Sequence, residues 1–95
     1  MSEAARKVSR TVEIVNERGL HARASAKFVK LAGDYEAEVT VSREGQTVDA
    51  RSIMGLMMLA AGIGSSIEIS AEGAEAKAAV NALAELVAAR FDEER

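Results

Sequence analysis

The 95-residue sequence contains no cysteine, no proline and no tryptophan, and it has only one histidine. Without cysteine, the chain can form no disulfide, no thiolate zinc site and no cysteine nucleophile. A transition-metal site built from several histidines is excluded by the same composition. We therefore expect no metal site of these types.

Long apolar runs are also missing. No stretch approaches the roughly 20 apolar residues that cross a bilayer, and residues 1–10 lack the apolar core of a signal peptide. The chain is 48% apolar and 28% charged, which is typical of a folded globular protein. We expect a cytoplasmic protein that does not bind membranes and that forms a single domain over residues 1–95.

The two signs of charge are unevenly distributed along the chain. Residues 1–30 carry seven Lys or Arg against three Asp or Glu, a net +4, whereas residues 31–95 carry five against twelve, a net −7. A basic surface formed by the first third would attract acidic protein partners. Nucleic acid is the competing partner for such a surface, but a pI near 5.2 and only 3% aromatic residues disfavour it.

Hydrophobic periodicity predicts four strands and three helices. Alternation with a period of two indicates strands, with Val12 and Ile14 of the first strand facing the core. Stretches of helix formers with apolar residues three or four apart indicate helices. The predicted elements are strand 8–15, helix 22–32, strand 35–42, a hairpin turn over 43–46, strand 47–49, helix 52–61, strand 66–70 and helix 75–90.

The same patterns predict which faces are buried. The apolar stripe of helix 22–32 consists of Ala22, Ala26, Val29 and Ala32, and that of the last helix, extended past its end, of Val80, Leu83, Val87 and Phe91. Gly33 is suited to a left-handed cap after the first helix. Alternation on the strands predicts an antiparallel sheet with helices on one side, an α+β sandwich in the order β-α-β-β-α-β-α. The pattern alone leaves other α+β sandwiches open, ferredoxin-like ones in particular.

One stretch, Gly19-Leu20-His21-Ala22-Arg23, combines residues that suit a phosphoryl group. Gly19 allows a tight turn, and His21 lies at the predicted helix start, where free N–H groups and the helix dipole favour anions. Arg23 adds a guanidinium that fits phosphate oxygens. A single histidine beside a glycine turn is in most proteins an ordinary surface residue, so the pattern alone does not decide between the two explanations.

The stretch Gly19-Leu20-His21-Ala22-Arg23 closely resembles the active-site signature of the HPr family, the histidine phosphocarriers of the bacterial phosphoenolpyruvate-dependent phosphotransferase system. A second stretch, Ser52-Ile53-Met54-Gly55-Leu56-Met57, begins thirty-one residues after His21 (52 minus 21) and is similar to the family's regulatory-serine segment. The resemblance covers about residues 7–90. The family usually has proline after the arginine, where this chain has Ala24. Alanine is also a good helix former, so we expect a looser site entrance but an intact site.

The resemblance implies an open-faced β-sandwich, with a four-stranded antiparallel sheet and three helices on one face. It also implies that His21 accepts a phosphoryl group at Nδ1 from phosphorylated enzyme I, which phosphoenolpyruvate charges, and passes it to an enzyme IIA-type protein. The amides of Ala22 and Arg23, with the Arg23 guanidinium, would neutralise the phosphoryl oxygens. The resemblance also implies a carrier that itself uses no metal and no cofactor. We expect a monomer that serves sugar uptake or regulation, and Ala24 together with Ser52 favours the nitrogen-related, regulatory branch.

Ser52 has two explanations. At the start of a helical stretch, it suits a structural N-cap. In the HPr family, the matching serine is phosphorylated in many bacteria by a dedicated HPr serine kinase/phosphorylase, and a phosphate there would change the surface that partners meet. We therefore treat Ser52 as a candidate regulatory site.

Apolar residues of helix 52–61 exceed what one helix face can bury. Because two leucines already supply the inward pair, we predict that Ile53, Met54 and Met57 form an exposed patch beside His21, used for partner docking. The patch also supports an alternative function, a regulatory protein-binding module that acts without phosphotransfer. A hydrolase is disfavoured, because no acid is placed to orient the imidazole.

Overall fold

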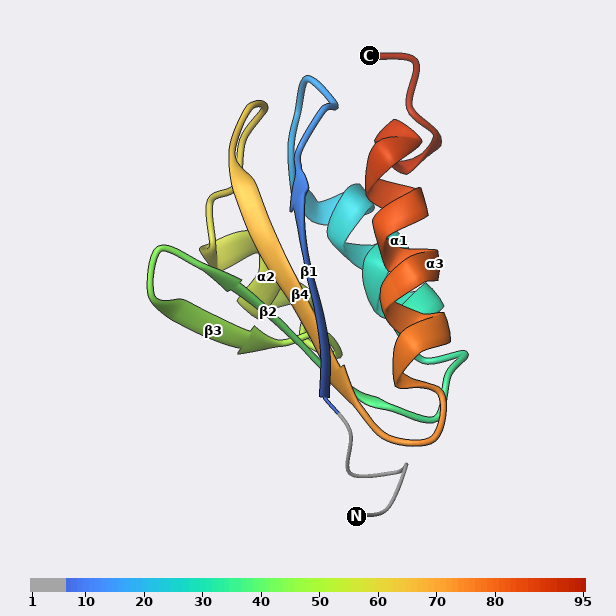
Figure 1. Cartoon of the computed structure of the whole chain (residues 1–95). Helices are drawn as coiled ribbons and strands as arrows, with labels where there is room; N and C mark the ends of the chain where they lie inside the picture. Colours follow the sequence, from blue (N-terminus) through green and yellow to red (C-terminus); the bar gives the residue numbers. More distant parts are fainter. Residues whose placement is uncertain (1–6) are drawn as a thin grey trace.

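The structure is a computed structural model that describes residues 7–95. Its elements are β1 (Lys7–Glu13), α1 (Ala22–Ala32), β2 (Glu38–Arg43), β3 (Gln46–Asp49), α2 (Ile53–Met58), β4 (Ser66–Glu72) and α3 (Ala76–Ala88), followed by a 3-10 turn (Arg90–Asp92). The strands form one antiparallel sheet in the order β1-β4-β2-β3, and the helices of this described part lie on one of its faces (Figure 1). The predicted α+β open-faced sandwich is therefore confirmed. Within residues 7–95, no helix is long and apolar enough to cross a membrane.

The core lies between the sheet and the helices. Alternate residues of the two central strands, β2 and β4, are buried, among them Val39, Val41, Ile67 and Ile69. The residues between them face the other side of the sheet, where short polar side chains pair across strands; the hydroxyls of Ser42 and Thr47, for example, are 2.7 Å apart. One face of the sheet is therefore solvated, as the alternation in the sequence predicts.

Helix α1 buries a different face from the predicted one. Its buried residues are Ala24, Ser25, Phe28 and Ala32. Of the predicted stripe, Ala32 is buried and Val29 is half-buried, whereas Ala22 and Ala26 are exposed. The helix is rotated because burying Phe28, its largest apolar side chain, removes more apolar area from water than burying the small alanines would.

The predicted left-handed cap at Gly33 is also wrong. Gly33 has a right-handed backbone, with φ −69° and ψ −12°. The N–H of Gly33 donates to the carbonyl of Val29, and the N–H of Asp34 donates to that of Leu31. Hydrogen bonds of this tightened last turn satisfy the final carbonyls, so no left-handed residue is needed.

Several element ends differ from the predicted boundaries. β1 ends at Glu13 instead of 15, β2 begins at Glu38 instead of 35, and β4 continues to Glu72 instead of 70. β4 is longer because it is a central strand, and both β1 and β2 pair with it as far as Glu72. α2 ends at Met58 instead of 61, since Ala60 has φ 52°, which a right-handed helix cannot contain.

The hairpin between β2 and β3 follows the prediction closely. Its central residues, Glu44 and Gly45, have φ values of 48° and 82°. Positive φ at both central residues is the geometry of a type I′ turn, whose twist matches that of paired strands. β3 begins at Gln46, one position before the predicted 47.

After α3 the chain makes a turn of reversed, left-handed backbone conformation. The helix ends at Ala88, before the predicted 90, and Arg90, Phe91 and Asp92 then have φ values of 60°, 52° and 62°. The predicted stripe of Val80, Leu83, Val87 and Phe91 is buried as expected. Phe91 nevertheless reaches the core from the reversed turn and not from the helix face.

Candidate functional site

His21 stands at the N-terminal end of α1, as the sequence predicts. It is the N-cap residue, with extended backbone angles (φ −71°, ψ 179°), and its side chain makes no capping hydrogen bond. The imidazole is 23% exposed. The amides of Ala22 and Arg23 donate to no backbone carbonyl within residues 7–95, as is usual in a first helical turn. These N–H groups are therefore available to an anion beside the imidazole.

The turn before His21 is held by the chain around Ala61. Leu20 is buried, and its N–H donates to the carbonyl of Ala61 at 3.0 Å. Gly19 has φ 64°, and a Cβ at this position would lie 2.3 Å from the same carbonyl oxygen. Nδ2 of the fully buried Asn16 donates to the carbonyl of Gly19 at 3.0 Å. Only glycine fits this approach, which places His21 at the start of the helix.

A carboxylate that the sequence analysis does not predict lies against His21. Oε2 of Glu93 pairs with Nε2 of His21, and Oε1 of Glu93 accepts a hydrogen bond from Nδ2 of Asn16 at 2.9 Å. The expectation that no acid orients the imidazole is therefore wrong. Glu93 and His21 are 72 positions apart, and the reversed turn after α3 brings them together. No local spacing could have revealed this pair.

The pKa of Glu93 reflects these contacts. Burial opposes the charged carboxylate, but hydrogen bonds from Asn16 and His21 and the nearby charge of Arg18 outweigh burial and hold the pKa of Glu93 below its usual value. The residue is therefore ionised at neutral pH.

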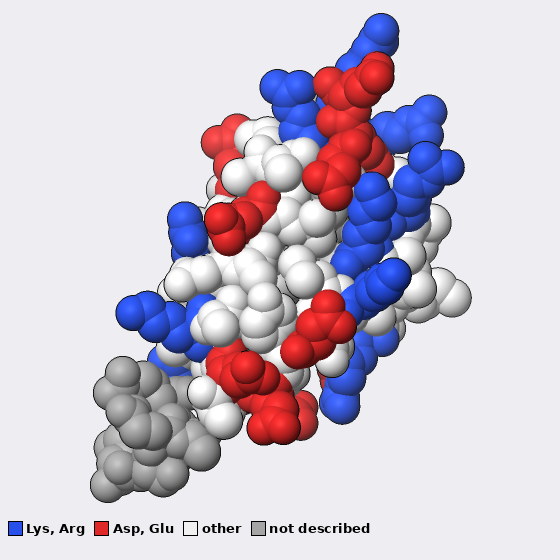
Figure 2. Space-filling model, turned by 90° about the vertical axis from the view of Figure 1, so that its right-hand side faces the viewer, with Lys and Arg blue, Asp and Glu red and all other residues white. Residues whose placement is uncertain are grey.

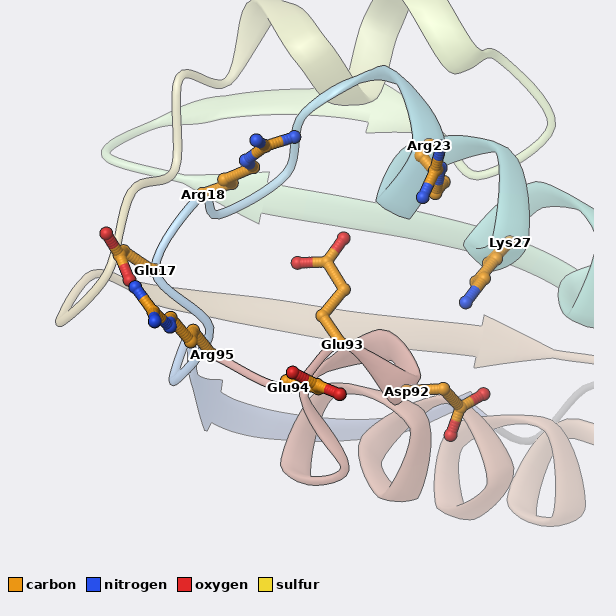
Figure 3. Close-up of a pocket in the computed structure, with 8 residues that line it drawn as sticks. All are labelled: Glu17, Arg18, Arg23, Lys27, Asp92, Glu93, Glu94 and Arg95. Atoms are coloured by element: carbon orange, nitrogen blue, oxygen red, sulfur yellow. The ribbon is translucent and has the colours of Figure 1, made fainter.

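Basic side chains surround the Glu93 carboxylate on the side of α1. In Figure 3 the carboxylate points between Arg18 and Arg23, and Lys27 lies one helical turn beyond Arg23. A hollow of about 410 Å³ opens here, lined by Glu17, Arg18, Arg23, Lys27, Asp92, Glu93, Glu94 and Arg95. In the described part of the chain, Arg23 forms no ion pair with a carboxylate. Its guanidinium is therefore available to an incoming anion.

The basic surface expected from the first third of the chain is present. Figure 2 shows Lys and Arg side chains in a band along one side of the helical face. α1 contributes Arg23, Lys27 and Lys30, at spacings of four and three residues that share one side of a helix. Across residues 7–95, no group of three or more His, Cys, Asp or Glu side chains could hold a metal ion.

Ser52 is the N-cap of α2, so its structural explanation is confirmed. Its Oγ accepts a hydrogen bond from the N–H of Gly55 at 2.9 Å. The side chain is partly exposed at the start of the helix. Capping and later modification are compatible, because a phosphate would occupy the same helix end.

The predicted apolar patch on α2 is exposed. Ile53, Met54 and Met57 are 41%, 71% and 41% exposed, and Leu56 and Leu59 supply the buried pair. Met58 and Ile63, which the sequence analysis did not include, enlarge the exposed apolar surface. α1 and α2 are in contact, so this surface adjoins the helix that carries His21.

Comparison with known proteins gives matches over nearly the whole chain. The family model described as the PTS HPr component phosphorylation site matches residues 8–89. The chain is 51% identical over 86 residues to the phosphocarrier protein HPr of Cupriavidus necator, covering 90% of this chain and 97% of that protein. It is 42% identical over 87 residues to the phosphocarrier protein NPr of Shewanella violacea, covering 92% and 96%. Among solved structures, HPr-C-His from Thermoanaerobacter tengcongensis gives a TM-score of 0.88 at 39% identity, covering 93% and 99%.

Proposed function

The chain belongs to the HPr family of phosphocarrier proteins, and on this basis we propose that His21 accepts a phosphoryl group from phosphorylated enzyme I and passes it to an enzyme IIA-type protein. The observation that carries the proposal is the placement of His21 at the open N-terminus of α1, with Arg23 in the same helical turn and free of ion pairs within residues 7–95. The acceptor acts either in sugar uptake or in the nitrogen-related branch. Ala24 and Ser52 favour the nitrogen-related branch.

The chemistry follows from the two ring nitrogens. Nε2 of His21 is engaged by Glu93, which leaves Nδ1 as the free nucleophile. Nδ1 attacks the phosphorus of the donor's phosphohistidine, and the bond from phosphorus to the donor nitrogen breaks. The amides of Ala22 and Arg23 and the Arg23 guanidinium neutralise the equatorial oxygens during transfer. An open surface site suits a carrier, because the group must also be released to the acceptor.

We assign partner docking and its regulation to α2. Ile53, Met54 and Met57 provide the exposed apolar contact for enzyme I and for the acceptor. Phosphorylation of Ser52 by an HPr serine kinase/phosphorylase would place a double negative charge at the edge of this contact and weaken docking.

The exposure of the same patch favours a second candidate, a regulatory protein-binding module without phosphotransfer. The test is intact mass after incubation with enzyme I and phosphoenolpyruvate, followed by brief acid treatment. A carrier gains one phosphoryl group that acid removes, since phosphohistidine is acid-labile and phosphoserine is not, and a His21→Ala variant gains none. No gain by folded protein with an active donor would refute the carrier and support the binding module.

A further inference from the structure

We propose that Glu93 is a positioning residue for phosphoryl transfer: its carboxylate, held by Asn16, accepts the Nε2–H of His21 and so keeps the lone pair on Nδ1 free. The inference rests on the proposed function, because Glu93 acts on the phosphoryl group only through the imidazole. It adds to the site a residue from the far end of the chain and a buried amide that supports it.

Both oxygens of the Glu93 carboxylate make contacts that suit this role. Oε2 pairs with Nε2 of His21, and Oε1 receives the Asn16 amide at 2.9 Å. The side chains of His21 and Glu93 are only 23% and 17% exposed, so water competes weakly for the pair. A hydrogen bond to an ionised acceptor is stronger than one between neutral groups, and it fixes both the tautomer and the orientation of the ring.

Asn16 is an independent sign that this contact matters. Its Nδ2 donates to the carbonyl of Gly19 and to Glu93, so both amide protons serve the site. Its Oδ1 is buried and has no hydrogen-bond partner within residues 7–95. An unpaired buried acceptor lowers stability. The presence of Asn16 is explained by its two side-chain N–H groups, because no apolar side chain could donate these hydrogen bonds.

The turn that delivers Glu93 is unfavourable in itself and is held from several sides. Arg90, Phe91 and Asp92 are three successive non-glycine residues with positive φ, which persist only where the surroundings impose them. The Phe91 side chain is fully buried, and its carbonyl accepts a hydrogen bond from Nζ of Lys27 at 2.7 Å. Glu93 is therefore fixed over the start of α1 and is not part of a frayed terminus.

The transfer step is balanced without any proton leaving His21. With the proton on Nε2, the Nδ1 lone pair forms the new bond to phosphorus, while the electron pair of the broken bond goes to the donor imidazole. The His21 ring becomes cationic, and the Glu93 carboxylate stabilises that charge. When the acceptor attacks, the electron pair returns to Nδ1 and the ring leaves as neutral imidazole. Glu93 therefore assists transfer in both directions.

The test compares Glu93→Gln with Glu85→Gln in the full chain. Glu85 is exposed on α3 and lies outside the hollow beside His21, so the two variants remove the same charge, but only Glu93→Gln removes the carboxylate from His21. Single-turnover transfer from phosphorylated enzyme I gives the rate constant and the half-saturating donor concentration separately. Nitrogen-15 NMR of the unphosphorylated protein follows the His21 Nε2–H signal independently of any transfer.

For Glu93→Gln, we expect a rate constant about tenfold lower, the worth of one charge-assisted hydrogen bond, with unchanged half-saturation and an altered Nε2–H signal. Glu85→Gln should match the wild type in all three measurements. A wild-type rate constant in Glu93→Gln, or an equal loss in Glu85→Gln, would overturn the positioning role while leaving the carrier function intact. Failure of the wild-type protein to gain a phosphoryl group would overturn the proposed function itself.

Discussion

The two nitrogens of His21 have different surroundings, and this asymmetry defines the residue's chemistry. Nε2 is paired with the Glu93 carboxylate, whereas the helix end beside the ring offers the amides of Ala22 and Arg23, which have no backbone partner in the described part of the chain. A carboxylate therefore meets one ring nitrogen, while N–H groups that suit an anion lie at the helix start. This asymmetry supports the proposal that the ring takes the phosphoryl group at Nδ1.

At the residue scale, Arg23→Ala should slow transfer far more than it weakens docking. The guanidinium is free of ion pairs within the described chain, and in the proposed mechanism it neutralises charge on the transferring group, so we expect a rate constant lower by about a hundredfold. Lys30→Ala, which removes a positive charge further along α1, is the control and should affect only docking. The measurement is single-turnover transfer at several donor concentrations. Equal effects of the two variants would remove Arg23 from the mechanism.

Gly19 offers a second prediction at this scale. Gly19→Ala combines a left-handed backbone with a clash against the Ala61 carbonyl, so we expect a loss of more than about 2 kcal/mol in the free energy of unfolding. Gly64 also has a positive φ, of 87°, but has no atom within 4 Å of an added Cβ. Gly64→Ala should therefore lose only about 1 kcal/mol. Urea unfolding measures the loss in both variants. Similar losses would contradict the steric role given to the close approach between Gly19 and the Ala61 carbonyl.

At the scale of elements, Ser52 is both the structural N-cap of the six-residue helix α2 and a candidate regulatory site. The two roles can be separated by substitution at Ser52. Ser52→Ala should cost about 1 kcal/mol, because it leaves the Gly55 amide uncapped, yet transfer should stay near normal. Ser52→Asp retains a capping oxygen and should keep the stability, but its charge beside the apolar patch should raise the half-saturating concentration of enzyme I.

Urea unfolding and steady-state transfer kinetics together test this separation. Normal kinetics in Ser52→Asp would refute the regulatory role. Full stability in Ser52→Ala would show that the observed cap contributes nothing.

The reversed turn after α3 predicts an unusual stabilising substitution. Arg90 is exposed and has φ 60°, so Arg90→Gly should relieve backbone strain and raise the free energy of unfolding by about 1 kcal/mol. At the preceding Ala89, where φ is −84°, substitution by glycine should lower the free energy of unfolding by about 0.5–1 kcal/mol. Thermal unfolding of both variants measures the difference. If both lose stability, the turn is not strained at Arg90.

At the scale of the whole molecule, the contact between Glu93 and His21 joins the end of the chain to its first helix. The pKa of Glu93 is lowered in the folded protein, so the ionised carboxylate favours the folded state. Its contribution is complete above the pKa of an unfolded glutamate, about 4.3, and is lost as the pH falls through the lower folded-state value.

We therefore expect the stability difference between the wild type and Glu93→Gln to be largest near neutral pH and to shrink steadily in acid. Urea unfolding across a pH series measures it. Glu85→Gln, which makes the same change at an exposed position of α3, is the matched control. A difference that is independent of pH would mean that the Glu93 carboxylate is not linked to folding.

Local features of the chain could be predicted from the sequence, because they depend on neighbouring residues. The alternation of β2 and β4, the hairpin turn at Glu44 and Gly45, the placement of His21 at a helix start and the Ser52 cap all follow from short-range rules of backbone and side chain. The matched spacing of the His21 and Ser52 stretches also identified the family.

Other features were decided only by tertiary packing. The rotation of α1 depends on how Phe28 fits into the core, and the length of β4 depends on pairing with two neighbouring strands. The contact of Glu93 with His21 requires a left-handed turn of non-glycine residues, which local propensity opposes and buried Phe91 imposes. A contact across 72 positions has no local signature, because its energy comes from groups that meet only after the chain has folded.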